Sequence, residues 1–230
     1  MRSGLVTTDS IPVLAAGVGI RHRSRWLLRS VSFRVNARPP GGVVLGIASQ
    51  PAAASAVVAL LAGLARPAHG ELRVLGKDLT SPAGRAAVRP HVGIARSPGR
   101  PESLIRIRGM IEHAARAAGI GGHDRARRSA AILDRLALTP WADVRLRDAP
   151  RAVSRRAGLA AAAVHEPELL LLDRLLDGLA PRERASVAAG ARELTRDTII
   201  IAAGHDATTL RLTCDEVLTL SDGILTGDKH

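Results

Sequence analysis

Aromatic side chains are scarce in this sequence, which contains two tryptophans, one phenylalanine and no tyrosine among 230 residues. Proteins that hold single-stranded nucleic acid stack its bases on aromatic rings, so this mode of binding is nearly excluded. Hydrophobic residues nevertheless make up 46% of the chain, which is typical of a packed globular protein. The core must therefore be built from aliphatic side chains.

Cysteine and long apolar runs are also in short supply. A single cysteine, Cys214, excludes an internal disulfide. The longest apolar runs, at residues 157–164 and 169–172, fall far short of the ~20 residues that cross a bilayer. The sequence opens with no charged segment followed by an apolar one, as a secretory leader would. We expect a cytoplasmic protein with no transmembrane segment of its own.

The charge of the chain is unbalanced, with a formal net charge of +12 at neutral pH. Such an excess suits nucleic acid, an anionic membrane surface or an acidic partner. An arginine-rich, solvated surface is the simpler interpretation, and nucleic acid is not expected as a partner.

Hydrophobic periodicity and turn residues predict an alternation of strands and helices. A helical stretch at 103–137 interrupts it. A length of 230 residues suits one such domain with a smaller subdomain. The expected elements are strands at 11–20, 30–35 and 43–47, a helix at 55–65, strands at 71–75 and 92–95, a helix at 154–164, a strand at 169–173, a helix at 182–194, a strand at 198–202 and a hairpin of 216–220 with 224–226.

Five segments of the sequence resemble motifs of the ATP-binding-cassette ATPases. Residues 60–79 look like the segment after the phosphate-binding loop, and residues 165–173 resemble the Walker B strand. Residues 178–184 resemble the D-loop, 204–206 the switch-histidine loop and 214–223 the closing hairpin. Because order and spacing agree with the family along most of the chain, the whole domain is similar to a cassette.

The resemblance implies an α/β fold with a P-loop NTPase-like (RecA-like) core, an antiparallel β-subdomain and an inserted helical subdomain. The expected domain covers residues 11–228, with the helical subdomain at about 98–153 and an N-terminal extension at 1–10. Within this family, the sequence is similar to the ATP-binding subunits of drug and antibiotic exporters.

The phosphate-binding loop departs from the family pattern G-x-x-x-x-G-K-[ST]. Ala54 stands where the family lysine would neutralise phosphate charge, Ala48 and Ala53 replace glycines, and Pro51 removes an N–H donor. We therefore expect weak binding of ATP or none. The degenerate loop consists of Ala48, Ser49, Gln50, Pro51, Ala52, Ala53, Ala54, Ser55 and Ala56.

Four further positions bear on metal binding and hydrolysis. The resemblance makes Ser55 and Asp173 the ligands of Mg²⁺, if nucleotide binds; the alternatives are a helix N-cap and a polar strand end. Arg174 replaces the catalytic glutamate and cannot act as a base, although it could pair with Asp173 or lend charge to phosphate. His205 matches the switch histidine, or is simply a hydrogen-bonding residue at a strand end.

The remaining family motifs are also altered. The signature motif aligns with residues 149–153, which contain neither serine nor glycine, and the D-loop aspartate is Ala180. The Q-loop glutamine falls near Ser97, and the adenine-stacking aromatic residue falls near His22. Since family dimers build each site from both subunits, this chain would weaken both sites of a dimer.

The resemblance therefore predicts a nucleotide-binding subunit of an exporter-like ABC transporter that binds ATP and Mg²⁺ weakly and has no family catalytic residues left for hydrolysis. Its implied partners are a membrane-spanning permease and a second cassette, and its implied place is the inner face of the cell membrane. Two alternatives stay open: a stand-alone pseudo-ATPase that regulates or scaffolds a partner, and an active ATPase with a rebuilt site.

Overall fold

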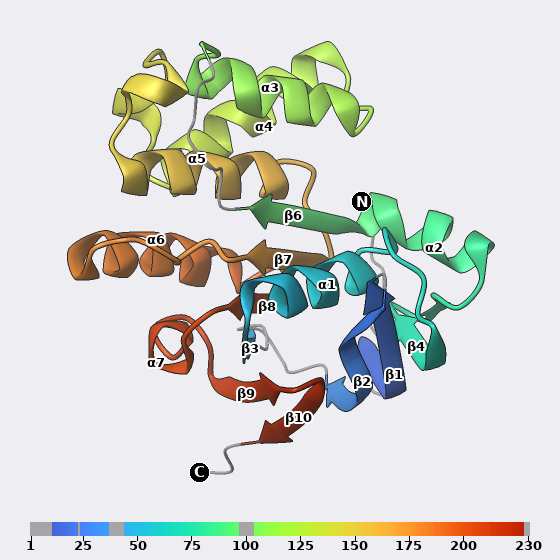
Figure 1. Ribbon diagram of the computed structural model, residues 1–230. Helices are drawn as coiled ribbons and strands as arrows, with labels where there is room; N and C mark the ends of the chain where they lie inside the picture. The colour runs from blue at the N-terminus through green and yellow to red at the C-terminus, as the bar shows by residue number, and fades with distance from the viewer. Residues whose placement is uncertain (1–10, 23, 37–43, 97–103, 228–230) are drawn as a thin grey trace.

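A computed structural model describes residues 11–22, 24–36, 44–96 and 104–227 of the chain (Figure 1). Several expectations lie outside these residues: the N-terminal extension at 1–10, the Q-loop position near Ser97, and the domain limits at 98 and 228. The side chain of His22 is also outside the described part. The limit of the helical subdomain at about 153 stays a prediction.

The centre of the fold is a six-stranded sheet with the strand order β10-β9-β3-β8-β7-β6. Five strands run parallel and β10 is antiparallel to its neighbour. Parallel strands are covered on both faces and are therefore apolar throughout, as the buried run from Leu169 to Leu172 shows. The strands are β3 (Val44–Ser49), β6 (Val92–Arg96), β7 (Leu169–Asp173), β8 (Ile199–Gly204), β9 (Glu216–Ser221) and β10 (Ile224–Gly227).

A second, antiparallel sheet has the order β2-β1-β4-β5. Its first two strands extend past the predicted bounds at residues 20 and 30, because β1 continues to His22 and β2 begins at Arg25. Leu28 in this stretch is fully buried, so core packing outweighs the polar character of its neighbours. The strands are β1 (Val13–His22), β2 (Arg25–Val35), β4 (His69–Val74) and β5 (Lys77–Asp78).

Helix α1 (Pro51–Leu61) lies between the two sheets (Figure 1). Its buried face joins one aliphatic core with side chains from both sheets, including Val13 of β1 and Leu171 of β7. A short helix, α2 (Pro82–Val88), follows β5 and was not predicted. Its N-cap is Ser81, whose hydroxyl accepts a hydrogen bond from the N–H of Gly84 at 3.0 Å.

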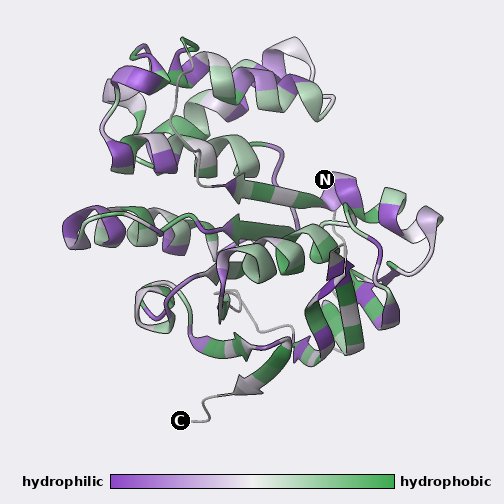
Figure 2. Ribbon diagram, viewed as in Figure 1, coloured by the Kyte–Doolittle hydropathy of each residue, from purple (hydrophilic) through white to green (hydrophobic). Residues whose placement is uncertain are grey.

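Helices cover the opposite face of the six-stranded sheet, and Leu170 and Leu172 point into this second core. Helices α3 to α5 stack beside the edge strand β6 (Figure 1), and the buried strands are the most hydrophobic part of the chain (Figure 2). No helix in the described part of the chain is long and apolar enough to span a membrane. The helices are α3 (Ile107–Ala117), α4 (Gly122–Arg135), α5 (Arg151–Ala163), α6 (Pro181–Leu194) and α7 (Ala207–Leu210).

The apolar residues of α3 are buried only in part. Ile111 and Ala115 are fully buried and Ala114 packs against the same core. Ala118 is exposed instead, because α3 ends at Ala117 and Ala118 is its C-cap residue.

Candidate functional site

The polar residues singled out from the sequence lie along one edge of the six-stranded sheet. Parallel pairing places the carboxyl ends of β3, β6, β7 and β8 together at this edge. Asp173, the last residue of β7, is in register with Arg96 of β6 and Ala203 of β8. In open α/β sheets, ligands bind beyond the carboxyl ends of the strands, so this edge is the candidate site.

The junction between β3 and α1 contains a single residue. Strand β3 ends at Ser49, Gln50 is the N-cap, and α1 begins at Pro51. The predicted helix start at residue 55 is therefore wrong by four residues. Proline is favoured in the first helical turn, and alanine is the strongest helix former. The residues from Pro51 onward therefore form the first turn of α1 and not a loop.

This early helix start changes the surroundings of the positions that the family pattern assigns to phosphate binding. The N–H of Ala54 donates to the carbonyl oxygen of Gln50 at 2.9 Å, as an ordinary helical hydrogen bond. The Ala54 side chain is 0% exposed and packs in the core between the sheets. The side chain at the lysine position thus faces the core and not a ligand. Of the other members of the predicted loop, Ala48, Ser49, Ala53 and Ala56 are buried, whereas Gln50, Pro51 and Ala52 are exposed.

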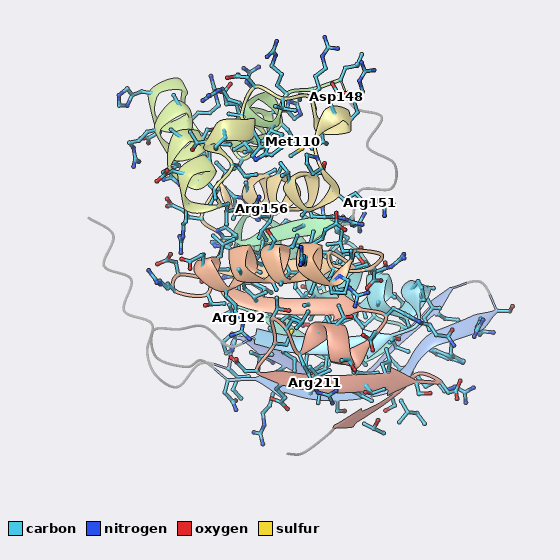
Figure 3. All side chains as sticks on the ribbon, turned by 90° about the vertical axis from the view of Figure 1, so that its left-hand side faces the viewer. Met110, Asp148, Arg151, Arg156, Arg192 and Arg211 are labelled. Atoms are coloured by element: carbon cyan, nitrogen blue, oxygen red, sulfur yellow. The ribbon has the colours of Figure 1, made fainter. Side chains whose placement is uncertain are left out.

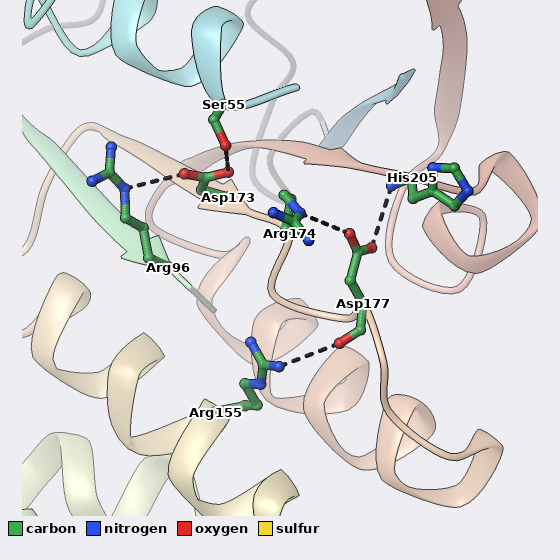
Figure 4. A network of polar contacts seen from close by, with 7 residues as sticks. All are labelled: Ser55, Arg96, Arg155, Asp173, Arg174, Asp177 and His205. Carbon is green, nitrogen blue, oxygen red and sulfur yellow. Dashed lines mark hydrogen bonds and ion pairs between the residues drawn. The ribbon is translucent and has the colours of Figure 1, made fainter. Parts of the chain in front are cut away.

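Ser55 and Asp173, the predicted metal ligands, are brought together. The Ser55 hydroxyl donates to Oδ1 of Asp173 at 2.8 Å (Figure 4). The other carboxylate oxygen, Oδ2, lies 3.1 Å from Nε of Arg96. The Asp173 side chain is 7% exposed and that of Arg96 is 56% exposed. Sequence reasoning missed Arg96, although it directly follows a predicted strand that adjoins the Walker B strand.

This arrangement does not fit a bound Mg²⁺ ion. Magnesium takes oxygen ligands at octahedral positions and is usually bound by one or two carboxylates together with substrate phosphates. Both oxygens of Asp173 already have protein partners. Among the residues that the structure describes, no three His, Cys, Asp or Glu side chains form a group able to hold a metal.

Arg174 pairs with Asp177 and not with Asp173, contrary to one expectation. Its Nε donates to Oδ2 of Asp177 at 3.1 Å, and its backbone has a positive φ of 56°. The N–H of His205 donates to the other oxygen of Asp177 at 3.3 Å, while the His205 side chain lies at the surface. Asp177 is therefore the centre of this network (Figure 4). No motif pointed to it from the sequence.

Three more arginines hold the loop that follows β7. Arg155 donates to the carbonyl oxygen of Asp177 at 3.2 Å, Arg151 to that of Gly178 at 3.3 Å, and Arg184 to that of Leu179 at 2.8 Å. Burial, followed by repulsion from Arg151, lowers the pKa of Arg155. Arg151 and Arg155 lie on the first turns of α5, which begins within the stretch aligned with the signature motif. Figure 3 shows Arg151 at this end of α5.

A hollow of about 380 Å³ adjoins the N-terminal end of α1. Arg25, Trp26 and Arg29 of β2 line one side, and Gln50 and Ala53 line another. The Trp26 ring is partly exposed and its centre lies 5.3 Å from that of His69. Trp26, four residues beyond the expected aromatic position at His22, is thus the aromatic side chain at this hollow.

Curated proteins similar to this chain are ATP-binding subunits of ABC transporters. A methionine import ATP-binding protein of Burkholderia mallei is 29% identical over 187 residues, 80% of this chain and 47% of that protein. A Nod factor export ATP-binding protein of Neorhizobium galegae is 26% identical over 220 residues, 94% of this chain and 62% of that protein. The chain thus spans about half the length of the curated relatives it matches. No protein-family model matches the chain.

Solved structures with the same fold are ATP-binding cassettes. The cbiO1 protein of Clostridium perfringens, part of an ABC transporter complex, superposes with a TM-score of 0.82, 18% identity and coverage of 95% of this chain and 88% of that one. A nucleotide-free cassette from an ABC transporter gives a TM-score of 0.78 at 14% identity, over 95% and 90% of the two chains. The fold is that of an ABC transporter ATPase domain, so the predicted resemblance and the P-loop NTPase-like fold class are confirmed.

Proposed function

We propose that this chain is a nucleotide-binding-domain subunit of an ABC transporter that binds ATP weakly and does not hydrolyse it. The observation that carries the proposal is the start of α1 at Pro51, which leaves no loop to surround phosphates. Backbone N–H groups and a lysine normally provide this binding. Here Ala54 is buried and its N–H is already bonded within the helix.

The energetic consequence follows from the missing lysine alone. A hydrogen bond to a charged group contributes about 1.5–3 kcal/mol. Because about 1.4 kcal/mol corresponds to a tenfold change in affinity, we expect the missing lysine alone to lower the affinity for ATP by about 10- to 100-fold. The altered backbone should lower it further.

Hydrolysis lacks its base. A guanidinium stays protonated at ordinary pH and cannot accept a proton from water. The Arg174 side chain is moreover held on Asp177. The Asp173 carboxylate is engaged instead by Ser55 and Arg96.

Weak binding of nucleotide has one feature in its favour. The hollow beside α1 offers an aromatic wall at Trp26 and two cationic side chains, Arg25 and Arg29. Aromatic rings stack on bases, and arginines bind phosphates. We propose that any residual nucleotide binding occurs there.

Partners and location follow from the relatives. Import and export subunits are both among them, so the exporter-like character rests on the sequence pattern alone. We propose a membrane-spanning permease and a second cassette as partners, at the cytoplasmic face of the cell membrane. A stand-alone regulatory or scaffolding role is the alternative; recovery of the chain from the soluble fraction of its own cells, without a permease, would favour it.

Equilibrium binding of Mg-ATP to the purified chain, with and without an equimolar active cassette, tests the proposal together with phosphate release. We expect a dissociation constant above about 1 mM, weaker than about −4 kcal/mol, and no release from the chain alone. Sub-millimolar binding with steady turnover that disappears in Asp173→Ala would instead establish an active ATPase with a rebuilt site.

A further inference from the structure

Two carboxylates at the carboxyl edge of the sheet each have an arginine partner. Asp173 pairs with Arg96, and Asp177 pairs with Arg174. Both carboxylates are largely buried, with side-chain exposures of 7% and 16%. A buried carboxylate needs a counter-charge, and here each has a guanidinium from the same chain.

We propose that Arg96 is a tethered cation that takes the place of the divalent metal at Asp173. This inference rests on the proposed function, since a site that bound and hydrolysed Mg-ATP would need Asp173 for the metal. With Arg96 in this role the site does not depend on a metal, so that Mg²⁺ neither occupies nor stabilises it.

The sheet itself places Arg96 for this role. Arg96 and Asp173 are the last residues of adjacent parallel strands and are partners in the ladder. Neighbouring strands are about 4.7–4.9 Å apart, so the two side chains leave the sheet next to each other. The Nε–Oδ2 distance of 3.1 Å is within hydrogen-bonding range. The contact therefore needs no rearrangement of the backbone.

Both oxygens of the Asp173 carboxylate thereby have a partner in the chain. Oδ1 accepts the Ser55 hydroxyl and Oδ2 faces Arg96. A divalent ion at Asp173 would lie beside the Arg96 guanidinium as a like charge, and a guanidinium does not lose its proton. The cluster also joins three elements, α1, β7 and β6.

The test is thermal unfolding of the full chain with and without Mn²⁺ at about 10 mM, a concentration that saturates weak oxygen-ligand sites. The melting temperature of the wild type should not respond to Mn²⁺. Arg96→Gln leaves Asp173 unpaired, so its melting temperature should fall by about 3 °C or more and should rise again on addition of Mn²⁺. This recovery should be absent in the double variant Arg96→Gln/Asp173→Asn.

Arg73→Gln is the matched control, because Arg73 is also a strand arginine in an ion pair, with Glu71 at 2.7 Å, but both side chains are about half exposed. It should neither lower the melting temperature comparably nor create a response to Mn²⁺. If Arg96→Gln does not fold, Arg96→Lys keeps the positive charge and should fold and ignore Mn²⁺ like the wild type; a response to Mn²⁺ in this variant would overturn the proposal.

Three other results would also overturn it. The first is a wild-type response to Mn²⁺ that is lost in Asp173→Asn, the second is an Arg96→Gln variant with no response, and the third is a response that survives in the double variant. Wild-type binding of Mn²⁺ without ATP turnover would defeat this inference alone. ATP turnover by the wild type would defeat the proposed function.

Discussion

The interior of the six-stranded sheet and its carboxyl edge differ in how they relate to the cassette family. In the interior, Leu169 to Leu172 alternate between two aliphatic cores and are all buried, as the Walker B strand of a cassette requires. At the edge, the next residues are Asp173 and Arg174, and they bond to other side chains of the same chain. The interior thus follows the family pattern, whereas the polar residues at the edge are paired within the chain.

The physical reason is that the two regions stabilise the protein by different means. Apolar burial contributes roughly 25 cal/mol for each Å² removed from water, and it depends on shape and hydrophobicity throughout the core. Polar contacts between exposed side chains contribute little net stability, so many replacements of such residues are tolerated. A domain can therefore keep its architecture while its site changes completely.

The largest expected effect comes from the interior. Leu171→Ala should reduce the free energy of unfolding by about 2–5 kcal/mol, because a fully buried leucine leaves a cavity. Urea denaturation measures this loss. The exposed Leu64 is the control, and Leu64→Ala should change stability by less than about 0.5 kcal/mol. Equal losses at the two sites would mean that β7 is not the centre of the core.

The next effect tests whether the site can be restored by one residue. Ala54→Lys introduces the family lysine at a fully buried position and should reduce the free energy of unfolding by about 3 kcal/mol, through overpacking and the burial of charge. Ala52 is exposed, two residues earlier on the same helix, and Ala52→Lys should be nearly neutral in the same urea titration. A stable Ala54→Lys variant that binds Mg-ATP more tightly would show that a phosphate loop can form.

The alternation of strands and helices was predictable because it depends on local patterns in the sequence. The apolar runs of β3, β7 and β8 and the helices between them follow from periodicity and turn residues. The start of α1 was predicted four residues late because the family motif suggested a loop, whereas Pro51 and the alanines after it favour helix. Helix α2 was missed because it is short and mostly exposed.

The candidate site was predictable only where the family supplied a position. Ser55 and Asp173 were named from the resemblance, and they do meet. Arg96 and Asp177 were not, because their roles depend on strand register and on a loop conformation that no local pattern encodes. Arg174 was recognised as a lost base, yet its partner Asp177 is set by the positive φ of Arg174, which directs the loop after β7.

A smaller effect is expected at the start of α7, which also lies at the carboxyl edge. Asp206 accepts hydrogen bonds from the hydroxyl of Thr209 at 2.6 Å and from its N–H at 2.8 Å, and these bonds lower the pKa of Asp206. As an N-cap it should contribute about 1 kcal/mol. Asp206→Ala should lose this amount at pH 7, whereas the exposed Asp134→Ala should not.

The same contribution depends on pH in a defined direction. Because the pKa of Asp206 is lower in the folded state, its stabilisation is complete above the unfolded value of about 3.9 and disappears as the pH falls through the folded value. The difference in unfolding free energy between wild type and Asp206→Ala should therefore shrink below about pH 4. A difference that grows with acid would contradict the capping role.

The smallest expected effect is on activity. It tests whether the missing base is the only reason that the carboxyl edge of the sheet does not hydrolyse ATP. Arg174→Glu restores the family residue, and a positioned general base contributes about 10²- to 10⁴-fold to a rate. That factor applies only to a bound and oriented substrate, and α1 still begins at Pro51 with Ala54 buried. Phosphate release should stay at background in Arg174→Glu, as in Arg66→Glu, which makes the same charge change at an exposed position. If Arg174→Glu alone released phosphate, the edge would already hold Mg-ATP in a reactive position. The difference between the interior and the edge of the sheet would then depend on one residue.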